Sequence, residues 1–214
     1  TLTGNFIDYS PFPKSLSILD SVPRTVLISR RVQAVALYEK GKLKFWGPAS
    51  TGKEFTQTPA GLHYGNYKAK LKISTINKDW ILPYYFNFMN FEGIGTHEYT
   101  LPGYPASHGC VRLRKEEALE IYNWANQWKL DDKGQIVLTN GNPFIVIGDY
   151  NFDKPVPWYD LAVDPKSNFL TDSEKDILKD YVVRYMKDKR NFAKDFEEIN
   201  GITLPLGKNT EAIQ

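Results

Sequence analysis

Residues 95–113 read Gly-Thr-His-Glu-Tyr-Thr-Leu-Pro-Gly-Tyr-Pro-Ala-Ser-His-Gly-Cys-Val-Arg-Leu, and the rest of the chain is organised around this stretch. It holds two of the three histidines and the only cysteine of the 214 residues. An imidazole can take the proton of a thiol and leave a nucleophilic thiolate. The spacing predicts a strand ending near His97, an irregular link, and a turn that leads from Cys110 into a helix.

Cys110 is the candidate nucleophile. A lone cysteine is by default a small buried hydrophobe, but Gly109, His108 and the charged Arg112 are poor neighbours for a core position. At the start of a helix and beside imidazoles, the pKa of the thiol is expected to fall. His97 is the candidate general base. His108 is also close to the thiol, and the sequence leaves open which imidazole takes the proton.

The turn before the cysteine is a candidate oxyanion hole. Backbone N–H groups of residues 107–110 would lie at the start of the helix, where they could stabilise a tetrahedral oxyanion. Gly109 would let a substrate carbonyl approach the backbone. Arg112 is interpreted as a guanidinium that anchors a substrate carboxylate, with a solvated or structural salt-bridge residue as the alternative.

Aromatic residues are abundant, with 13 Tyr, 12 Phe and 5 Trp, which fits strands and also grooves that hold an extended polymer. Tyr84, Tyr85 and Asn87 precede the histidine and are candidate groove walls, although packing within a strand explains them about as well. His63 follows a turn, has no chemical partner nearby in sequence, and is interpreted as incidental.

Composition argues against several other classes of function. One cysteine excludes an internal disulfide and a multi-cysteine metal site. Zinc held by His97, His108 and Cys110 would lack a fourth ligand at suitable spacing, so we expect no metal and no cofactor. A net charge of +2 without a basic run argues against nucleic acid. No apolar run approaches the ~20 residues of a membrane span, and no signal peptide is visible at Thr1.

The periodicity predicts a mainly β fold with helices. Strands are expected over 25–29, 32–39 and 42–47 as an antiparallel meander, and over 67–74 and 80–89, where Pro83 indicates an edge or a bulge. Apolar residues at helical spacing predict a helix over about 115–129. The short apolar runs 135–139 and 143–148 are expected to be the last core strands.

The chain divides into three segments. Residues 1–23 are expected to form an extended arm lying on a catalytic domain of residues 24–150. Residues 151–214 are expected to be a surface linker and a helical extension. Thr171-Asp172-Ser173-Glu174 reads as a capping box. The helix that follows carries one apolar stripe and is expected to end at Asn200-Gly201. The stripe consists of Leu178, Val182, Tyr185, Phe192, Phe196 and Ile199.

Together these motifs resemble the L,D-transpeptidase catalytic domain family (YkuD-like) over about residues 24–148. The histidine followed by Ser107-His108-Gly109-Cys110-Val111-Arg112 carries most of the resemblance, because this run is far more specific than a short glycine motif. Ser50-Thr51-Gly52, Thr58-Pro59-Ala60-Gly61 and the aromatic run Pro83-Tyr84-Tyr85-Phe86 occur in the order seen in that family.

The resemblance implies a β-sandwich with the cysteine at the bottom of a groove covered by a flap or loop. It implies a peptidoglycan substrate and a periplasmic or cell-envelope location. The residues matching the family motif would then be the nucleophile Cys110, the base His97 and the donor-stem anchor Arg112. Ser107, His108 and Gly109 would shape the pocket and the oxyanion hole.

The implied reaction is acyl transfer. The thiol attacks a tetrapeptide stem, D-alanine leaves, and the side-chain amine of a second stem resolves the acyl-enzyme into a 3→3 cross-link. Carbapenem β-lactams would be covalent inhibitors. Two alternatives stay open: an L,D-carboxypeptidase or amidase using water with the same Cys/His site, and a non-catalytic cell-wall-binding module with an unreactive thiol.

Three features depart from the family pattern. The link from His97 to Ser107 is shorter than usual, which suggests a reduced loop over the groove and keeps hydrolysis open. Glu98 follows the histidine where Gly or Ser is usual, which is tolerable if a backbone carbonyl orients the imidazole. Residues 151–214 have no counterpart in the minimal domain.

Overall fold

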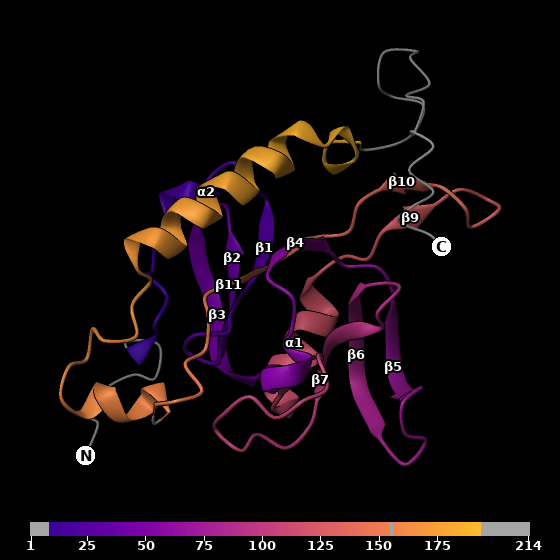
Figure 1. Cartoon of the computed structure of the whole chain (residues 1–214). Coiled ribbons are helices and arrows are strands. Elements are labelled where there is room, and N and C mark those ends of the chain that lie inside the picture. Colours follow the sequence, from indigo (N-terminus) through magenta and orange to yellow (C-terminus); the bar gives the residue numbers. More distant parts are fainter. Residues whose placement is uncertain (1–8, 155, 194–214) are drawn as a thin grey trace.

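A curved sheet of nine strands forms the framework of the described part of the chain (Figure 1). The computed structural model describes residues 9–154 and 156–193. The strand order is β4-β11-β1-β2-β3-β8-β7-β6-β5, and a separate pair is formed by β9 and β10. The strands are β1 (Arg24–Ser29), β2 (Ala34–Glu39), β3 (Lys42–Ser50), β4 (Gly61–Tyr64), β5 (Lys68–Ile73), β6 (Ile81–Met89), β7 (Ile94–Glu98), β8 (Val111–Leu113), β9 (Lys129–Leu130), β10 (Val137–Thr139) and β11 (Pro143–Ile147). The α-helices are α1 (Lys115–Trp124) and α2 (Asp172–Lys187).

The predicted meander is confirmed, since β1, β2 and β3 pair antiparallel in chain order. The predicted strand 143–148 is also confirmed as β11, which pairs parallel with β1. Alternation along β1 decides which layer each side chain enters. Val26 and Ile28 enter the cluster that also contains Phe144 and Phe86, here named the inner core. Leu27 enters the cluster on the opposite face, here named the outer core.

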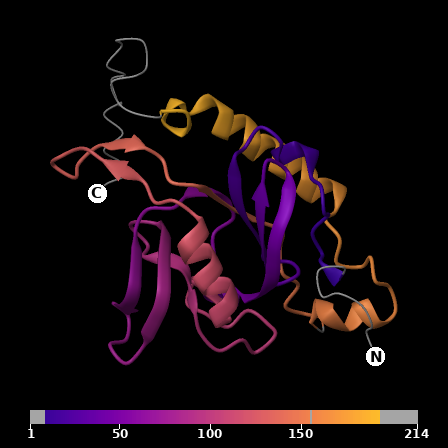
Figure 2. The ribbon, with the colours of Figure 1, turned by 180° about the vertical axis from the view of Figure 1, so that it is seen from behind.

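The inner core lies between the two halves of the curved sheet, β4-β11-β1-β2-β3 and β8-β7-β6-β5, and α1 packs into it (Figure 2). Ala118, Ile121 and Ala125 of the predicted helical stripe are fully buried there. The helix is shorter than predicted, because the chain turns extended at Ala125. Beyond that point the Trp128 amide donates to the Gly65 carbonyl, so tertiary pairing replaces another helical turn.

The remaining strand predictions concern residues 135–139 and Pro83. The run 135–139 is not a core strand, because β10 pairs only with β9 among the described strands. Pro83 does lie in β6, opposite Leu71 of β5. On its other side, β7 pairs with β6 only at 86–89, so no ladder partner there needs the missing N–H of the proline.

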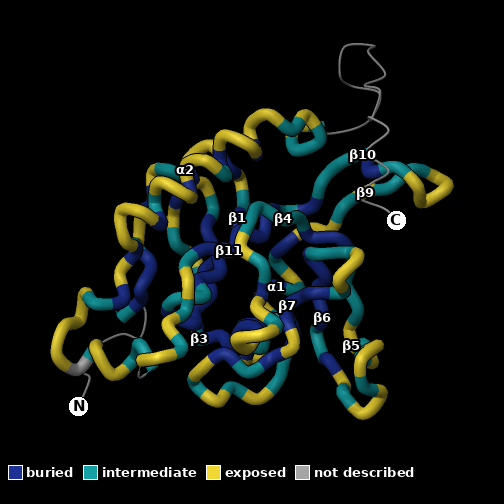
Figure 3. The backbone as a smooth tube through the Cα atoms, viewed as in Figure 1, coloured by how far each residue is buried: buried dark blue, intermediate teal, exposed yellow. Residues whose placement is uncertain are grey.

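The arm and the extension both cover the outer core. Phe12, Leu16 and Leu19 of the predicted arm are buried against it, while residues 1–8 lie outside the described residues. The helix α2 lies along the same face, with a buried inner side and an exposed outer side (Figure 3).

The capping box at the start of α2 is confirmed: the Thr171 side chain accepts from the Glu174 amide, and the Glu174 side chain accepts from the Thr171 amide. The helix ends at Lys187, earlier than predicted, and a 3-10 turn follows over Lys189–Asn191. Leu178, Val182 and Tyr185 are buried as predicted, whereas Phe192 is 47% exposed. Phe196, Ile199, Asn200 and Gly201 lie outside the described residues.

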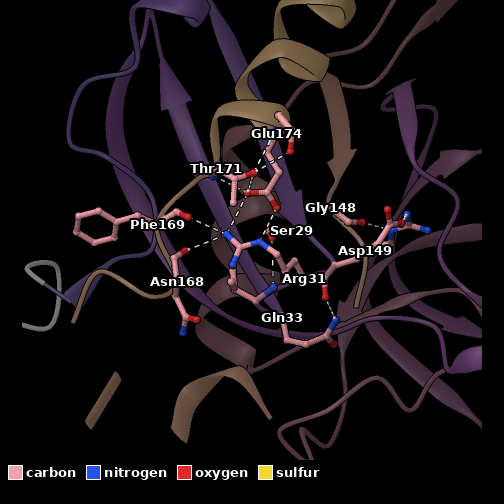
Figure 4. A network of polar contacts seen from close by, with 12 residues as sticks. Ser29, Arg31, Gln33, Gly148, Asp149, Asn168, Phe169, Thr171 and Glu174 are labelled. Carbon is pink, nitrogen blue, oxygen red and sulfur yellow. Dashed lines mark hydrogen bonds and ion pairs between the residues drawn. The ribbon is translucent and has the colours of Figure 1, made fainter. Parts of the chain in front are cut away.

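One ion pair ties this extension to the sheet. The Arg31 guanidinium donates to both carboxylate oxygens of Glu174, at 2.8 and 3.0 Å, and to the backbone carbonyl of Phe169 (Figure 4). The Glu174 side chain is only 5% exposed. The same carboxylate therefore caps the helix and fixes it to the turn between β1 and β2.

Candidate active site

The parallel pairing of β7 and β8 brings the central stretch together. His97 lies opposite Arg112 in this pairing, and Thr96 lies opposite Val111. Cys110 therefore comes immediately before β8. The prediction that its turn leads into a helix is wrong, since α1 begins only at Lys115. In the part of the chain that the structure describes, no helix begins at the thiol, so no helix N-terminus lowers its pKa there.

The segment that follows β3 holds the turn 107–110 in place. The Ser107 amide donates to the Thr51 carbonyl at 3.1 Å, and the Lys53 amide donates back to the Ser107 carbonyl at 3.0 Å. The buried Thr58 hydroxyl donates to the Gly109 carbonyl at 2.7 Å and accepts from the Gly52 amide at 3.0 Å. This is the structural role of the Ser-Thr-Gly and Thr-Pro residues noted in the sequence.

Gly109 is required by its backbone, because its φ of +118° is a conformation that L side chains rarely adopt. Its amide donates to the Ser107 hydroxyl at 3.0 Å, and that hydroxyl donates to the Cys110 carbonyl. The Gly109 amide is therefore satisfied within the turn. Of the backbone N–H groups of residues 107–110 that were predicted to form the oxyanion hole, those of Ser107 and Gly109 have partners within the fold, and the Cys110 N–H is kept as a candidate donor.

The Cys110 thiol is partly buried, and two backbone groups face its sulfur. The Gly95 N–H donates toward it, and Sγ lies 3.8 Å from the Gly93 carbonyl oxygen. Burial raises the pKa of the Cys110 thiol, against the smaller lowering effects of the Gly95 amide, Lys72 and Arg112. The expectation of a depressed thiol pKa is wrong, because desolvation outweighs the nearby positive charge.

His97 is buried with a fixed tautomer. Its Nδ1 lies 2.9 Å from the Glu98 carbonyl oxygen, and since a carbonyl only accepts, Nδ1 carries the proton and Nε2 is left as acceptor. Burial lowers the pKa of His97 to about 4, with Arg112 as a smaller lowering influence and the Glu98 carbonyl opposing it. A backbone carbonyl orients the ring, so the Glu98 side chain is not needed for that task.

His108 lies at the rim and has different surroundings. Its ring centroid is 5.0 Å from that of Trp80, and its Nε2 is 3.2 Å from the Lys53 ammonium. Partial loss of solvent around the ring, followed by the positive charges of Lys53 and Arg112, lowers the pKa of His108. Since Nε2 faces an ammonium and the ring is exposed, His108 is the poorer candidate for the base.

A cavity joins these groups. It is lined by the candidate nucleophile, both histidines, the serine and the arginine of the motif, together with Trp80, Tyr99 and residues of the β5–β6 hairpin. The full lining is Ser74, Ile76, Trp80, Leu82, His97, Tyr99, Ser107, His108, Cys110 and Arg112. Sequence reasoning missed Ser74, Ile76 and Leu82 of the hairpin. The only signal in the sequence is that Ile76 and Trp80 are large apolar residues in an otherwise polar link between two strands.

Arg112 projects a cation into this cavity. Its guanidinium lies 4.7 Å from the centre of the Tyr99 ring, and none of the ion pairs among residues 9–154 and 156–193 includes it. The salt-bridge alternative considered from the sequence is therefore not realised within the described chain.

Tyr84, Tyr85 and Asn87 do not line the cavity. Tyr84 packs edge-on against Tyr122, with ring centroids 6.0 Å apart. Tyr85 is fully buried beneath the site, where its ring stacks on that of His97 at 6.4 Å. Asn87 is buried and donates to the Tyr85 hydroxyl. Their interpretation as groove walls is corrected to packing and hydrogen bonding behind the site.

Among residues 9–154 and 156–193, no group of three or more His, Cys, Asp or Glu side chains is placed to hold a metal ion. Within the same residues, no helix has the length and apolar character needed to cross a bilayer.

Comparison with known proteins gives a consistent result. A family model described as L,D-transpeptidase catalytic domain (YkuD) matches residues 23–157, well over half of the chain. No curated protein matches. The mainly β fold and the resemblance noted from the motifs are thereby confirmed.

Solved structures similar to this chain include an L,D-transpeptidase (Yku) from Stackebrandtia nassauensis, with 26% identity over 60% of this chain and 57% of that chain and a TM-score of 0.48. An L,D-transpeptidase from Mycobacterium smegmatis is 17% identical over 59% of each chain, with a TM-score of 0.47. The LD transpeptidase LdtMt1 in complex with imipenem is 18% identical over 58% and 59%, with a TM-score of 0.47. This chain spans less than two thirds of each of these solved chains.

Proposed function

The chain belongs to the L,D-transpeptidase catalytic domain family, and we propose that it is a cysteine-dependent acyltransferase acting on peptidoglycan stem peptides. The observation that carries this proposal is the meeting of Cys110 and His97 at one cavity, with the imidazole held as the neutral Nε2 acceptor. A neutral acceptor beside a thiol is the arrangement that general-base activation needs.

The first half of the reaction forms a thioester. The Cys110 sulfur attacks the carbonyl carbon of the third stem residue while His97 Nε2 takes the thiol proton. The Cys110 N–H stabilises the tetrahedral oxyanion. The C–N bond to D-alanine then breaks, and the proton held by His97 passes to the departing amine.

The second half transfers the acyl group. The side-chain amine of another stem attacks the thioester and His97 accepts a proton from that amine. The C–S bond then breaks, and His97 returns the proton to the sulfur, which regenerates the thiol. Arg112 lines the cavity, and its guanidinium lies over the Tyr99 ring without a carboxylate partner among the described residues. We assign to it the carboxylate of the donor stem, which a guanidinium binds through paired hydrogen bonds.

Cys110 and His97 are expected to be neutral before the substrate binds, so the thiolate has to form during the reaction. With the thiol pKa raised and the pKa of His97 lowered to about 4, the pair rests as thiol and imidazole near pH 7. Proton transfer therefore accompanies attack on the substrate. A carbapenem, whose strained lactam is an acylating agent, is expected to react at the same sulfur by the same route.

Product analysis with purified disaccharide tetrapeptides tests the proposal. Cross-linked dimers with released D-alanine are expected from the wild type, and neither from Cys110→Ala. Tripeptides without dimers would identify water as the acceptor, making the protein an L,D-carboxypeptidase. An unchanged substrate would indicate a wall-binding module. We place the activity in the periplasm or cell envelope, where this substrate lies, and fractionation of the native host tests that location.

A further inference from the structure

Tyr85 is the contact shared by both reacting groups, although it does not line the cavity. Its ring lies against the His97 ring at 6.4 Å, with an interplanar angle of 28°. Its hydroxyl donates to the Gly93 carbonyl at 2.7 Å. The same carbonyl oxygen lies 3.8 Å from the Cys110 sulfur. One buried side chain therefore contacts both the base and a backbone carbonyl that faces the nucleophile.

The Gly93 carbonyl matters because it favours the unreactive form of the thiol. A carbonyl can accept a hydrogen bond from S–H but offers nothing to a thiolate, whereas the Gly95 N–H on the same sulfur favours the thiolate. The Tyr85 hydroxyl donates to that carbonyl and competes with the thiol for it. The tyrosine hydroxyl thus weakens the contact that holds the proton on sulfur.

The Lys72 ammonium packs against the face of the Tyr85 ring. The Lys72 ammonium lies 4.4 Å from the centre of the Tyr85 ring and 4.8 Å from the centre of the Tyr67 ring, and it also contacts the Tyr67 hydroxyl. Two aromatic faces hold an ammonium at a defined place. Lys72 comes from β5, so the hairpin that supplies part of the cavity lining also supplies this charge.

We infer that Tyr85 is a positioning residue for the acyl transfer proposed above, acting together with Lys72. Its ring supports the His97 imidazole, its hydroxyl occupies the Gly93 carbonyl, and its face holds an ammonium that attracts negative charge on the Cys110 sulfur. The inference rests on the proposed function for its biological meaning, but its physical content concerns only the reactivity of the thiol.

The ionisable side chains around the sulfur come from four strands and from the turn itself. They are Lys72, Tyr85, His97, Arg112 and His108, and Tyr99, just after β7, lines the same cavity. Arg112 is the second cation that favours the thiolate. Variants at Tyr85 and Lys72 leave it in place, so they should weaken thiolate formation without abolishing it.

The test is the rate of alkylation of Cys110 by iodoacetamide as a function of pH, which needs no peptidoglycan substrate. Tyr85→Phe keeps the ring and loses the hydroxyl; loss of one hydrogen bond is expected to slow alkylation at pH 7 about fivefold. The apparent pKa of the profile should rise. The plateau at high pH, where the thiol is ionised, should equal that of the wild type.

The adjacent Tyr84 supplies a matched control, because it packs against Tyr122 on α1 rather than behind the site. Tyr84→Phe should leave the profile unchanged. Lys72→Met should also raise the apparent pKa, whereas Lys70→Met, at an exposed position of the same strand, should not. Thermal unfolding of each variant reports whether the fold is kept.

Two results would overturn the inference. One is an alkylation profile of Tyr85→Phe that superimposes on the wild type. The other is a lowered plateau with no shift in apparent pKa, which describes a merely structural defect. Failure of the proposed function would appear differently, as unchanged muropeptides in the presence of a thiol with the expected profile.

Discussion

The turn that carries Cys110 and the start of α2 are each held by a contact between a threonine hydroxyl and the backbone, but the two contacts differ in the sequence distance that they span. At α2, the Thr171 hydroxyl accepts from the amide of Glu174, three residues away. At the turn, the Thr58 hydroxyl donates to the carbonyl of Gly109, fifty-one residues away. The first is a local rule of helix capping, and the second exists only after the sheet has formed.

The two regions contribute differently to the protein, one to its stability and the other to its reactivity. The extension stabilises the sheet from outside through the Glu174–Arg31 pair and the buried face of α2. The turn positions the Cys110 thiol and the backbone N–H groups beside it, so its contacts affect the geometry of the reaction. Changes at the turn should therefore alter rate, and changes at the extension should alter stability while leaving rate nearly intact.

The largest effect is expected at the catalytic pair. His97→Gln keeps a polar side chain of similar size but removes the Nε2 base, so acylation by a tetrapeptide should slow by about 10²–10⁴. Stopped-flow or quenched-flow measurement of acylation checks this. His63→Gln is the control, because His63 does not line the cavity. Equal rates in the two variants would remove His97 from the mechanism.

The second effect is a dependence of stability on pH. The pKa of His97 is lowered to about 4 in the folded chain, against about 6.5 unfolded, so the unfolded state binds the proton more readily. The stabilisation is fully present above pH 6.5 and is lost as pH falls toward 4, by about 3 kcal/mol. Urea unfolding across this range measures it.

His97→Gln should flatten the part of that slope that belongs to His97. The pKa values of His63 and His108 are also lowered, so a remaining slope in the same direction is expected. A slope unchanged by His97→Gln would show that the imidazole titrates normally in the folded protein.

The third effect sharpens the comparison at the turn. Thr58→Val keeps the shape of the side chain and removes the hydroxyl that bonds to both Gly109 and Gly52. Leaving buried backbone groups unsatisfied should cost about 2 kcal/mol of unfolding free energy. The rate of acylation should also fall roughly tenfold, since misplacing the turn by an amount that raises the activation free energy by about 1.4 kcal/mol slows the reaction tenfold. A stability loss without a rate loss would break the distinction drawn above.

The smallest effect is expected at the extension. Glu174→Gln keeps the capping box, because Gln can replace Glu in that motif, but it removes the charge facing Arg31. Since Arg31 is 24% exposed and can be partly hydrated, we expect about 1–2 kcal/mol of destabilisation. Asp172→Asn, whose Lys175 partner lies on the exposed surface, should change stability by less than about 0.5 kcal/mol.

Acylation by the Glu174→Gln variant should stay within about twofold of the wild type at a temperature where both are folded. A rate loss as large as that of Thr58→Val would mean that the extension contributes to catalysis as well as to stability.

Sequence reasoning succeeded where the signal was local or carried by a specific motif. The meander, the capping box and the cavity-lining set of Cys110, His97 and Arg112 fall in this class. It failed where tertiary contacts decide. The helix ends at Trp124 because the residues after it pair with a distant loop, and 137–139 pairs outside the main sheet.

The direction of the shift in the thiol pKa could not be predicted from the sequence either. Neighbouring imidazoles and an assumed helix start predicted a lowered thiol pKa, yet the structure has a strand there and a buried sulfur. Tyr85 shows the same limit: its place in an aromatic strand predicts a groove wall, whereas the folded chain buries it outside the cavity lining.

The central claim is that Cys110 becomes acylated with His97 as base, and intact-protein mass spectrometry tests it most directly. After incubation with a carbapenem, and separately with a disaccharide tetrapeptide, the wild type should gain the mass of one acyl group, located on Cys110 by peptide mapping. Cys110→Ala should gain none. An unmodified wild type with both reagents, or the same adduct on Cys110→Ala, would contradict the account.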